Sequence, residues 1–183
     1  MSLVAATAAP QADLIASHIR DVPDFPEPGI VFKDITGLLV DAEAFGAVID
    51  ALADAVPAGV DLVAGMEARG FILGAALAAR LGTGFVPIRK AGKLPPPTRA
   101  VTYDLEYGQA SLELREGTVR PGAGVLLVDD VLATGGTAAA AAELVETVGA
   151  RVVGLAFLLE LTALAGRDRL GGRAVSSILA TAP

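Results

Sequence analysis

Two adjacent carboxylates, Asp129 and Asp130, follow the continuously apolar run of residues 124–128. Paired carboxylates at the end of a strand can accept hydrogen bonds from the vicinal hydroxyls of a sugar, or hold a hydrated Mg²⁺ ion. The residues after them are small and glycine-rich, and they open a predicted helix. Their backbone N–H groups and two threonine hydroxyls could surround a phosphate at the positive end of that helix. The residues of this phosphate loop are Ala133, Thr134, Gly135, Gly136 and Thr137. Together the pattern predicts a site for a phosphorylated sugar.

Other folds also place acids or glycines after a strand. A tight turn between a strand and a helix uses the same small residues without any ligand. A receiver domain also ends its first strand in paired acids, but it needs a lysine downstream of them, and no lysine follows Lys93. The Walker A pattern, G-x-x-x-x-G-K-[ST], does not occur. A structural turn and a phosphorylated-sugar site remain as the two interpretations of this segment alone.

Basic residues are concentrated in one part of an acidic chain. The net charge of −7 disfavours a nucleic-acid partner, because phosphate backbones bind clustered cations. No acidic residue lies between Glu67 and Asp104, however, where six of the fourteen basic residues occur. They are Arg69, Arg80, Arg89, Lys90, Lys93 and Arg99. This stretch is either a solvated surface segment or a site for a highly charged small anion.

Composition excludes several other chemistries. The chain has no cysteine, which removes disulfides and thiol nucleophiles, and its single histidine, His18, cannot build a multi-histidine zinc site. No apolar run reaches the roughly 18 residues that a membrane span needs. The first ten residues lack the basic start of a signal peptide. We therefore expect a cytoplasmic protein without a membrane partner.

The elements that position the acid pair alternate between strand and helix. Predicted strands cover residues 61–64, 85–88, 111–114, 124–128 and 152–159. The first of them is expected to end in a turn at Gly65. Predicted helices begin after Asp41, near Phe71 and near Thr137, and the last two end at Gly82 and Gly149. This order predicts an α/β sheet with parallel strands. Ligands bind such sheets at the carboxyl ends of the strands, where the acid pair ends its strand.

Residues 89–108 are the least regular part of the pattern. The prolines at 95–97 cannot be helical and would not fit inside a sheet. We expect little regular structure here. A basic, proline-bearing segment of this length inside a domain is usually functional.

Residues 125–137 resemble the signature with which type I phosphoribosyltransferases bind 5-phosphoribosyl 1-pyrophosphate (PRPP). Enzymes for several bases and non-catalytic PRPP-sensing regulators share that signature. Two further segments, residues 24–35 and 103–108, narrow the resemblance to the adenine phosphoribosyltransferase family. Residues 89–95 and 158–162 also match, in the same order along the chain.

The resemblance implies a fold and a reaction. The implied fold is a single domain over residues 1–183, with a mainly parallel sheet flanked by helices. It comprises a small hood of about residues 1–35 over the base and an α/β core of residues 36–183 with a mobile loop at 89–107. The implied reaction converts adenine and PRPP to AMP and pyrophosphate in purine salvage. The family further implies a homodimer and a Mg²⁺ cofactor, bound mainly through PRPP with assistance from Asp129 and Asp130.

The resemblance also implies which residues bind PRPP. The acid pair contacts the ribose hydroxyls, and residues 133–137 cradle the 5-phosphate. The implied pyrophosphate residues are Glu67, Ala68, Arg69, Arg89, Lys90 and Lys93, some of them donated by a partner subunit. The family commonly has a cis peptide bond that would fall between Glu67 and Ala68. Adenine enzymes more often have Asp-Ser at these two positions. Pro96 replaces their usual glycine between two prolines, which should stiffen the loop.

The remaining implied roles concern the base and the proton. Backbone groups of Val31 and Lys33 would read the adenine edge while Phe32 stacks on the ring. Glu106 resembles the carboxylate that handles the proton near N7 of the base, and Arg69 acts with it in catalysis. Taken without the family, Phe32 could be ordinary core and Glu106 a solvated loop acid.

Two alternative functions share the PRPP signature. A hypoxanthine or guanine phosphoribosyltransferase usually meets the 6-oxo group of its base with a lysine of the hood, and no lysine follows Asp130. A PRPP-sensing regulator should carry a nucleic-acid-binding element, and this acidic chain has no basic recognition helix. Adenine therefore remains the predicted base.

Overall fold

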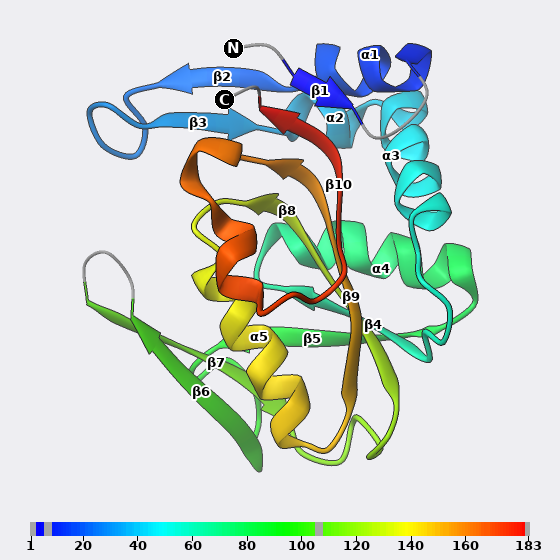
Figure 1. The fold of residues 1–183 in the computed structure, drawn as a ribbon, viewed down its shortest axis with the longest axis vertical. Helices are drawn as coiled ribbons and strands as arrows, with labels where there is room; N and C mark the ends of the chain where they lie inside the picture. The colour runs from blue at the N-terminus through cyan, green and yellow to red at the C-terminus, as the bar shows by residue number, and fades with distance from the viewer. Residues whose placement is uncertain (1–2, 6–8, 105–107, 182–183) are drawn as a thin grey trace.

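An eight-stranded sheet runs through the computed structural model, which describes residues 3–5, 9–104 and 108–181 (Figure 1). The strands, in their order across the sheet, are β1 (Leu3–Ala5), β10 (Val175–Thr181), β9 (Arg151–Glu160), β8 (Gly124–Leu132), β4 (Leu62–Met66), β5 (Gly84–Lys90), β7 (Gln109–Arg115) and β6 (Thr98–Asp104). The neighbours from β10 to β5 are parallel, and β1, β7 and β6 are antiparallel to their neighbours. The predicted α/β fold with a mainly parallel sheet is confirmed.

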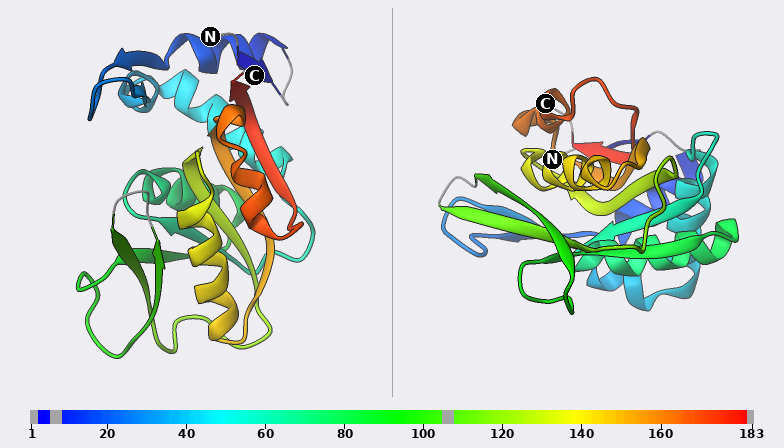
Figure 2. Two further views of the ribbon diagram at one scale, coloured as in Figure 1. Left: turned by 60° about the vertical axis from the view of Figure 1, so that its left-hand side comes forward. Right: turned by 90° about the horizontal axis from the view of Figure 1, so that it is seen from below.

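Helices cover both faces of this sheet (Figure 2). One face carries α5 (Gly136–Thr147), and the other carries α3 (Ala42–Asp54) and α4 (Arg69–Leu81), with α1 (Ala9–Ser17) and the short α2 (Thr36–Val40) beside them. Side chains of β8 alternate between the two cores: Val125 and Leu127 pack on the α5 side, and Leu126 and Val128 on the opposite side. Burial on both faces explains why this strand is continuously apolar. Two short 3₁₀ helices, η1 (Thr162–Leu164) and η2 (Gly166–Leu170), follow β9.

The structure confirms two predicted helix ends, each with a capping residue. Asp41 accepts a hydrogen bond from the backbone N–H of Ala44 at 2.8 Å and begins α3. Gly82 ends α4 in the left-handed conformation, with a φ of 68°. Both follow from the preference of a short carboxylate for the N-cap and of glycine for the left-handed C-terminal position.

Two strands extend further than predicted. The turn expected at Gly65 is wrong, because β4 continues to Met66 and Gly65 pairs with residues of both neighbouring strands. The end expected for the strand at Asp129 is also wrong, because β8 stays paired with β9 as far as Leu132. Pairing from both sides keeps these residues extended despite their glycine and acidic side chains.

Part of the segment expected to lack regular structure is a strand. Residues 98–104 form β6, which pairs with β7 along its whole length. The expectation for residues 89–108 is wrong there. The prolines at 95–97 lie between β5 and β6, where they interrupt no ladder. The peptide bond between Pro96 and Pro97 is cis, as is that between Phe25 and Pro26.

The N-terminal segment contributes to two sheets. Strands β2 (Arg20–Pro23) and β3 (Val31–Asp34) form a separate antiparallel hairpin above the carboxyl end of β8 (Figure 1). Strand β1 instead pairs with β10 at the edge of the main sheet, so residues 3–5 of the predicted hood belong to the core sheet. Within the described part of the chain, no helix is long and apolar enough to cross a membrane.

Candidate active site

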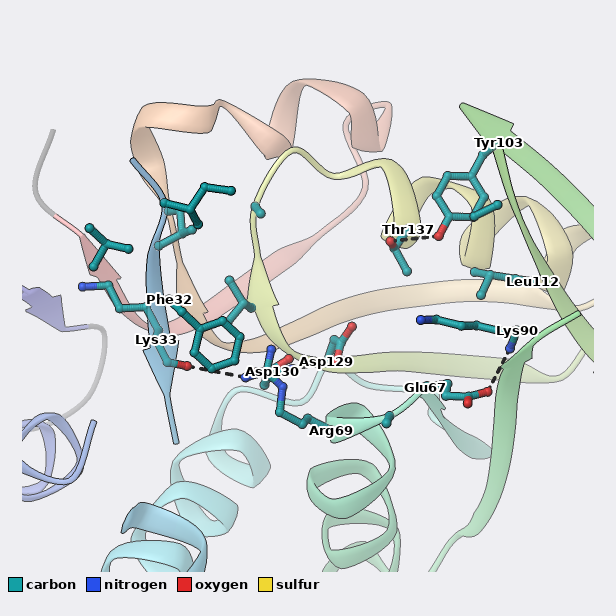
Figure 3. A pocket seen from close by; sticks show the side chains of 17 residues that line it. Phe32, Lys33, Glu67, Arg69, Lys90, Tyr103, Leu112, Asp129, Asp130 and Thr137 are labelled. Atoms are coloured by element: carbon teal, nitrogen blue, oxygen red, sulfur yellow. Dashed lines mark hydrogen bonds and ion pairs between the residues drawn. The ribbon is translucent and has the colours of Figure 1, made fainter. Parts of the chain in front are cut away.

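A cavity of about 540 Å³ lies between the β2–β3 hairpin and the carboxyl ends of β4 and β8 (Figure 3). The hairpin, the loop after β4, the end of β5 and the phosphate loop all contribute to its wall. The predicted site residues that line it are Val31, Phe32, Lys33, Glu67, Ala68, Arg69, Lys90, Asp129, Asp130, Ala133 and Thr137. Segments that are distant in sequence therefore meet in one cavity, as the predicted reaction requires.

The acid pair lies in the wall of this cavity, between the hairpin and the end of β5 (Figure 3). Asp130 is buried, with 4% of its surface exposed, and Asp129 is half-buried. Burial raises the pKa of the Asp129 carboxyl well above its ordinary value, and the neighbouring charge of Asp130 raises it further. Burial also raises the pKa of Asp130, although the guanidinium of Arg69 partly offsets this. Two desolvated acids of this kind are typical of a binding or catalytic site.

Arg69 connects the acid pair to the hairpin. Its Nε lies 2.9 Å from Oδ2 of Asp130, but that oxygen accepts no well-aligned hydrogen bond from the described residues. Its guanidinium carbon lies 4.8 Å from the centre of the Phe32 ring. Its Nη1 donates to the backbone carbonyl of Lys33 across 3.4 Å. Arg69 thus contacts two of the three predicted base-binding residues and one of the carboxylates that are predicted to bind the ribose.

The ammonium of Lys33 points away from the cavity (Figure 3). Its Nζ lies 2.5 Å from Oδ1 of Asp21, its partner across the hairpin, and only 6% of its side chain is exposed. The Lys33 backbone, rather than its charge, therefore faces the predicted base-binding end of the cavity. Phe32 contacts Phe25 edge to face, with ring centres 5.2 Å apart. Val31 lines the cavity and is exposed.

Glu67 organises the loop between β4 and α4, which is predicted to bind pyrophosphate. Its carboxylate accepts from the backbone N–H of Lys90 at 2.9 Å and pairs with Nε of Arg89 at 3.2 Å. The bond from the Lys90 amide, with the charge of Arg89, lowers the pKa of Glu67 despite its burial. The peptide bond between Glu67 and Ala68 is cis, as the family resemblance implies. Glu67 therefore stays ionised and ties this loop to the end of β5.

The three predicted cations of residues 89–93 are not equivalent. Lys90 extends from β5 into the cavity, and no carboxylate of the described residues pairs with its ammonium (Figure 3). Arg89 is engaged by Glu67, and its Nη1 donates to the carbonyl of Lys93 at 2.9 Å. Arg89 and Lys93 do not line the cavity. Of this group, the structure brings only Lys90 to the site within one chain.

The basic stretch between Glu67 and Asp104 does not form one anion site. Arg80 pairs with Asp50 at 3.0 Å and Arg99 pairs with Glu116 at 2.9 Å, both on the exposed surface. These two residues fit the solvated-surface interpretation. Arg69 and Lys90, which line the cavity, fit the anion-site interpretation.

The phosphate loop forms a second, smaller hollow of about 90 Å³ beside the main cavity. Residues 133–137 line it, including the predicted Thr134, Gly135 and Gly136. Gly135 has a φ of 80°, and a Cβ there would overlap the carbonyl oxygen of Gly166. Only glycine fits this turn, which directs the chain into α5 and leaves the first N–H groups of that helix without intrahelical partners. The loop can therefore bind an anion.

Several lining residues were not predicted as site residues. They are Ile30, Tyr103, Ala110, Leu112, Val131 and Leu161. Most are apolar and carry no chemical signal in a sequence. Tyr103 is different, because it begins the segment 103–108 that carries the family resemblance, and its position there could have identified it. The predicted catalytic residue Glu106 lies outside the described residues.

Comparisons with known proteins match most of the chain. Residues 39–178 match the phosphoribosyl transferase domain family. The adenine phosphoribosyltransferase of Frankia casuarinae is 60% identical over 169 residues, which are 92% of this chain and 90% of that protein. The crystal structure of adenine phosphoribosyltransferase from Thermoanaerobacter pseudethanolicus has a TM-score of 0.90 at 51% identity, covering 93% of this chain and 99% of that one.

A third similar structure contains ligands. It is adenine phosphoribosyltransferase from Saccharomyces cerevisiae, complexed with D-2,5-dideoxy-2,5-imino-altritol 1,6-bisphosphate and adenine. Its TM-score is 0.88 at 40% identity, with 93% of this chain and 99% of that chain covered.

Proposed function

This chain belongs to the adenine phosphoribosyltransferase family, and we propose that the cavity in Figure 3 joins adenine to the ribose 5-phosphate of PRPP, giving AMP and pyrophosphate. The family and the transferase activity predicted from the sequence are confirmed by these matches. The observation that supports this assignment best is the set of chemical groups that line the cavity. An aromatic hairpin, an acid pair, two cations and a helix N-terminus all face one space of a size that suits a nucleotide.

PRPP would lie along the carboxyl ends of β8 and β4. Its 5-phosphate fits the loop 133–137, and its ribose hydroxyls fit the carboxylates of Asp129 and Asp130. Its pyrophosphate then extends towards Arg69 and Lys90. A guanidinium and an unpaired ammonium complement that polyanion, and their positions support this orientation.

Adenine would lie under the hairpin, beside PRPP. Phe32 offers a ring face, and the backbone of Val31 and Lys33 offers both donors and acceptors to the base edge. The Lys33 carbonyl suits the 6-amino group, which is a donor. The 6-oxopurines present an acceptor there, and the ammonium that could serve it is held by Asp21 on the other side of the hairpin. This arrangement favours adenine over hypoxanthine or guanine.

The chemical step is a displacement at the anomeric carbon. The bond from that carbon to a pyrophosphate oxygen breaks, the sugar gains positive charge, and N9 of adenine forms the new bond. Arg69 and Lys90 stabilise the negative charge that develops on pyrophosphate, which in preorganised sites is usually the largest contribution to catalysis. The base must also lose a proton, and Glu106 is the proposed acceptor. General-base assistance of this kind contributes about 10²–10⁴-fold.

Mg²⁺ is the proposed cofactor. Mg²⁺ sites in nucleotide enzymes use one or two carboxylates together with substrate phosphates and water. Asp129 and Asp130 supply two carboxylates, and Oδ2 of Asp130 retains acceptor capacity. In this proposal the ion is bound mainly through PRPP, with the two carboxylates assisting. When bound, the ion would neutralise charge on the leaving pyrophosphate, and removal of Mg²⁺ with EDTA should abolish turnover.

The other parts of this proposal rest on the family resemblance. They are a single domain with a mobile loop at 89–107, a homodimer, and a cytoplasmic location. Lys93 is exposed outside the cavity of its own chain, which suits a role across a dimer interface. Sedimentation equilibrium tests the dimer, and a monomeric active enzyme would contradict it.

The assignment of the acid pair is tested by Asp130→Asn. This change keeps the shape of the side chain but removes its charge beside Arg69. We expect the KM for PRPP to rise at least about tenfold, since hydrogen bonds to charged groups contribute about 1.5–3 kcal/mol, while the KM for adenine changes little. The measurement is initial-rate kinetics with each substrate varied in turn. An unchanged KM for PRPP would contradict the proposed orientation.

A further inference from the structure

Tyr103 of β6 contacts the phosphate loop directly, in the wall of the cavity. Its hydroxyl oxygen lies 3.2 Å from Oγ1 of Thr137, near the N-terminus of α5 (Figure 3). Its ring packs beside the same loop, since a Cβ placed on Gly136 would lie 3.7 Å from Cδ2 of Tyr103. Both hydroxyl-bearing side chains are half-buried and line the main cavity, and Thr137 also lines the smaller hollow.

The direction of the hydrogen bond between the two hydroxyls follows from what each can donate. A threonine hydroxyl has one proton, and a phosphate oxygen at neutral pH is an acceptor. If Thr137 donates to the 5-phosphate, its oxygen is left to accept from Tyr103. Both hydrogen bonds can form only if the Tyr103 O–H donates to the Thr137 oxygen while the Thr137 O–H donates to the phosphate.

We propose that Tyr103 is a positioning residue for the 5-phosphate, because it fixes the hydroxyl of Thr137 as a donor to that group. This inference rests on the proposed function, in which residues 133–137 cradle the phosphate. It assigns to β6 a part in the recognition of PRPP that neither the paired acids nor the glycine-rich loop supplies.

The first test compares variants in steady-state kinetics with PRPP. We expect Tyr103→Phe, which keeps the ring, to raise the KM for PRPP about three- to tenfold, the net effect of one hydrogen bond, with kcat changed less than about twofold. Thr137→Val should raise the same KM at least as much. The double variant should be no worse than Thr137→Val alone, because Tyr103 acts through Thr137.

A matched control separates this role from general support of the β6–β7 hairpin. Oγ1 of Thr102 and Oγ of Ser111 lie 2.7 Å apart on the exposed side of the same two strands. Ser111→Ala removes a hydroxyl contact of the hairpin without touching the phosphate loop. We expect it to leave the KM for PRPP unchanged, and an increase like that of Tyr103→Phe would show a merely structural effect and overturn the inference.

The second test follows Tyr103 directly. The chain has no tryptophan and only two tyrosines, Tyr103 and Tyr107. In Tyr107→Phe, ultraviolet-excited protein emission therefore reports Tyr103 alone. Titration with ribose 5-phosphate should change this emission, because the hydrogen bond of the phenol changes with its partner. Ribose at the same concentrations should not, and equal responses to both sugars would contradict a role in phosphate recognition.

The possible outcomes distinguish the inference from the proposed function. If Thr137→Val leaves the KM for PRPP unchanged, the proposed phosphate cradle is wrong and the role of Tyr103 falls with it. If Thr137→Val weakens PRPP but Tyr103→Phe does not, only the role of Tyr103 is wrong. If the increases in the KM for PRPP of the two single variants multiply in the double variant, Tyr103 and Thr137 act independently. That result would also contradict the proposed role of Tyr103.

Discussion

Asp129 and Asp130 are two buried carboxyl groups whose ionisation the fold opposes. Burial and mutual repulsion raise the pKa of Asp129, and burial raises that of Asp130 despite the nearby guanidinium of Arg69. Each group would be easier to ionise in the unfolded chain. The folded protein therefore gives up stability to keep two carboxylates where the ribose of PRPP and its metal are proposed to bind.

We expect Asp129→Asn to raise thermal stability while it lowers activity. Asparagine keeps the Oδ1 acceptor that receives the backbone N–H of Asp130 at 2.9 Å, but it carries no charge. The rise in Tm at pH 7.5 should be about 2–4 °C, which corresponds to roughly 1 kcal/mol for a chain of this size. Differential scanning calorimetry measures it.

The difference in stability between Asp129→Asn and the wild type should depend on pH in a definite direction. The folded pKa of Asp129 is raised, so the cost of its ionisation is fully present above the folded pKa. It declines as the pH falls through that value and disappears below the unfolded pKa of about 3.9. The advantage of Asp129→Asn should therefore shrink on acidification. Asp50→Asn, at an exposed ion pair, serves as the control with little effect at any pH. A variant less stable than wild type at pH 7.5 would contradict this explanation.

At the scale of elements, the site depends on how closely α4 approaches β8. A Cβ on Gly70, in the first turn of α4, would lie 2.6 Å from the carbonyl oxygen of Val128 and 2.8 Å from Oδ1 of Asp129. Glycine at this position lets the helix bring Arg69 against the acid pair. The sequence shows an Arg-Gly pair, but not that the glycine faces a neighbouring strand.

Gly70→Ala should therefore destabilise the fold and the site together. Overpacking against backbone typically costs about 1–3 kcal/mol, and displacement of α4 would also move Arg69. Gly46→Ala is the matched control, because Gly46 lies inside α3 and a Cβ added there would meet no atom within 4 Å. It should gain about 0.5–1 kcal/mol from helix propensity. Thermal melts and kcat of both variants test this, and a neutral Gly70→Ala would contradict the close approach.

Most elements could be predicted because they carry a strong local signal. The apolar residues of α3 recur with helical spacing behind a capping Asp41, and β8 is continuously apolar because it is buried on both faces. Strand β6 could not be predicted, since prolines precede it and its pairing with β7 is its main support. That Leu112 and Leu161 line the cavity could not be predicted either. In a sequence, an apolar residue of the core cannot be distinguished from one that lines a binding site.

At the scale of the whole molecule, the site exists only when the parts assemble. Its walls come from the β2–β3 hairpin, the parallel strands of the main sheet and the antiparallel β6–β7 pair at the edge of that sheet. The hairpin and the β6–β7 pair lie on different sides of the cavity in Figure 3. The sequence motifs predicted the chemistry of each wall. Their distances could not be predicted, and neither could the way Arg69 joins Phe32 to Asp130.

The most direct test of the central assignment is the choice of base. AMP formation from PRPP and adenine with Mg²⁺ would be measured beside hypoxanthine, guanine and no base, with the wild-type chain and with Glu106→Ala. We expect turnover restricted to adenine and a loss of about 10²-fold or more in kcat for the variant. Turnover of a 6-oxopurine would keep the PRPP site but contradict the assigned base-binding hairpin. PRPP binding without turnover of any base would contradict the enzymatic assignment altogether.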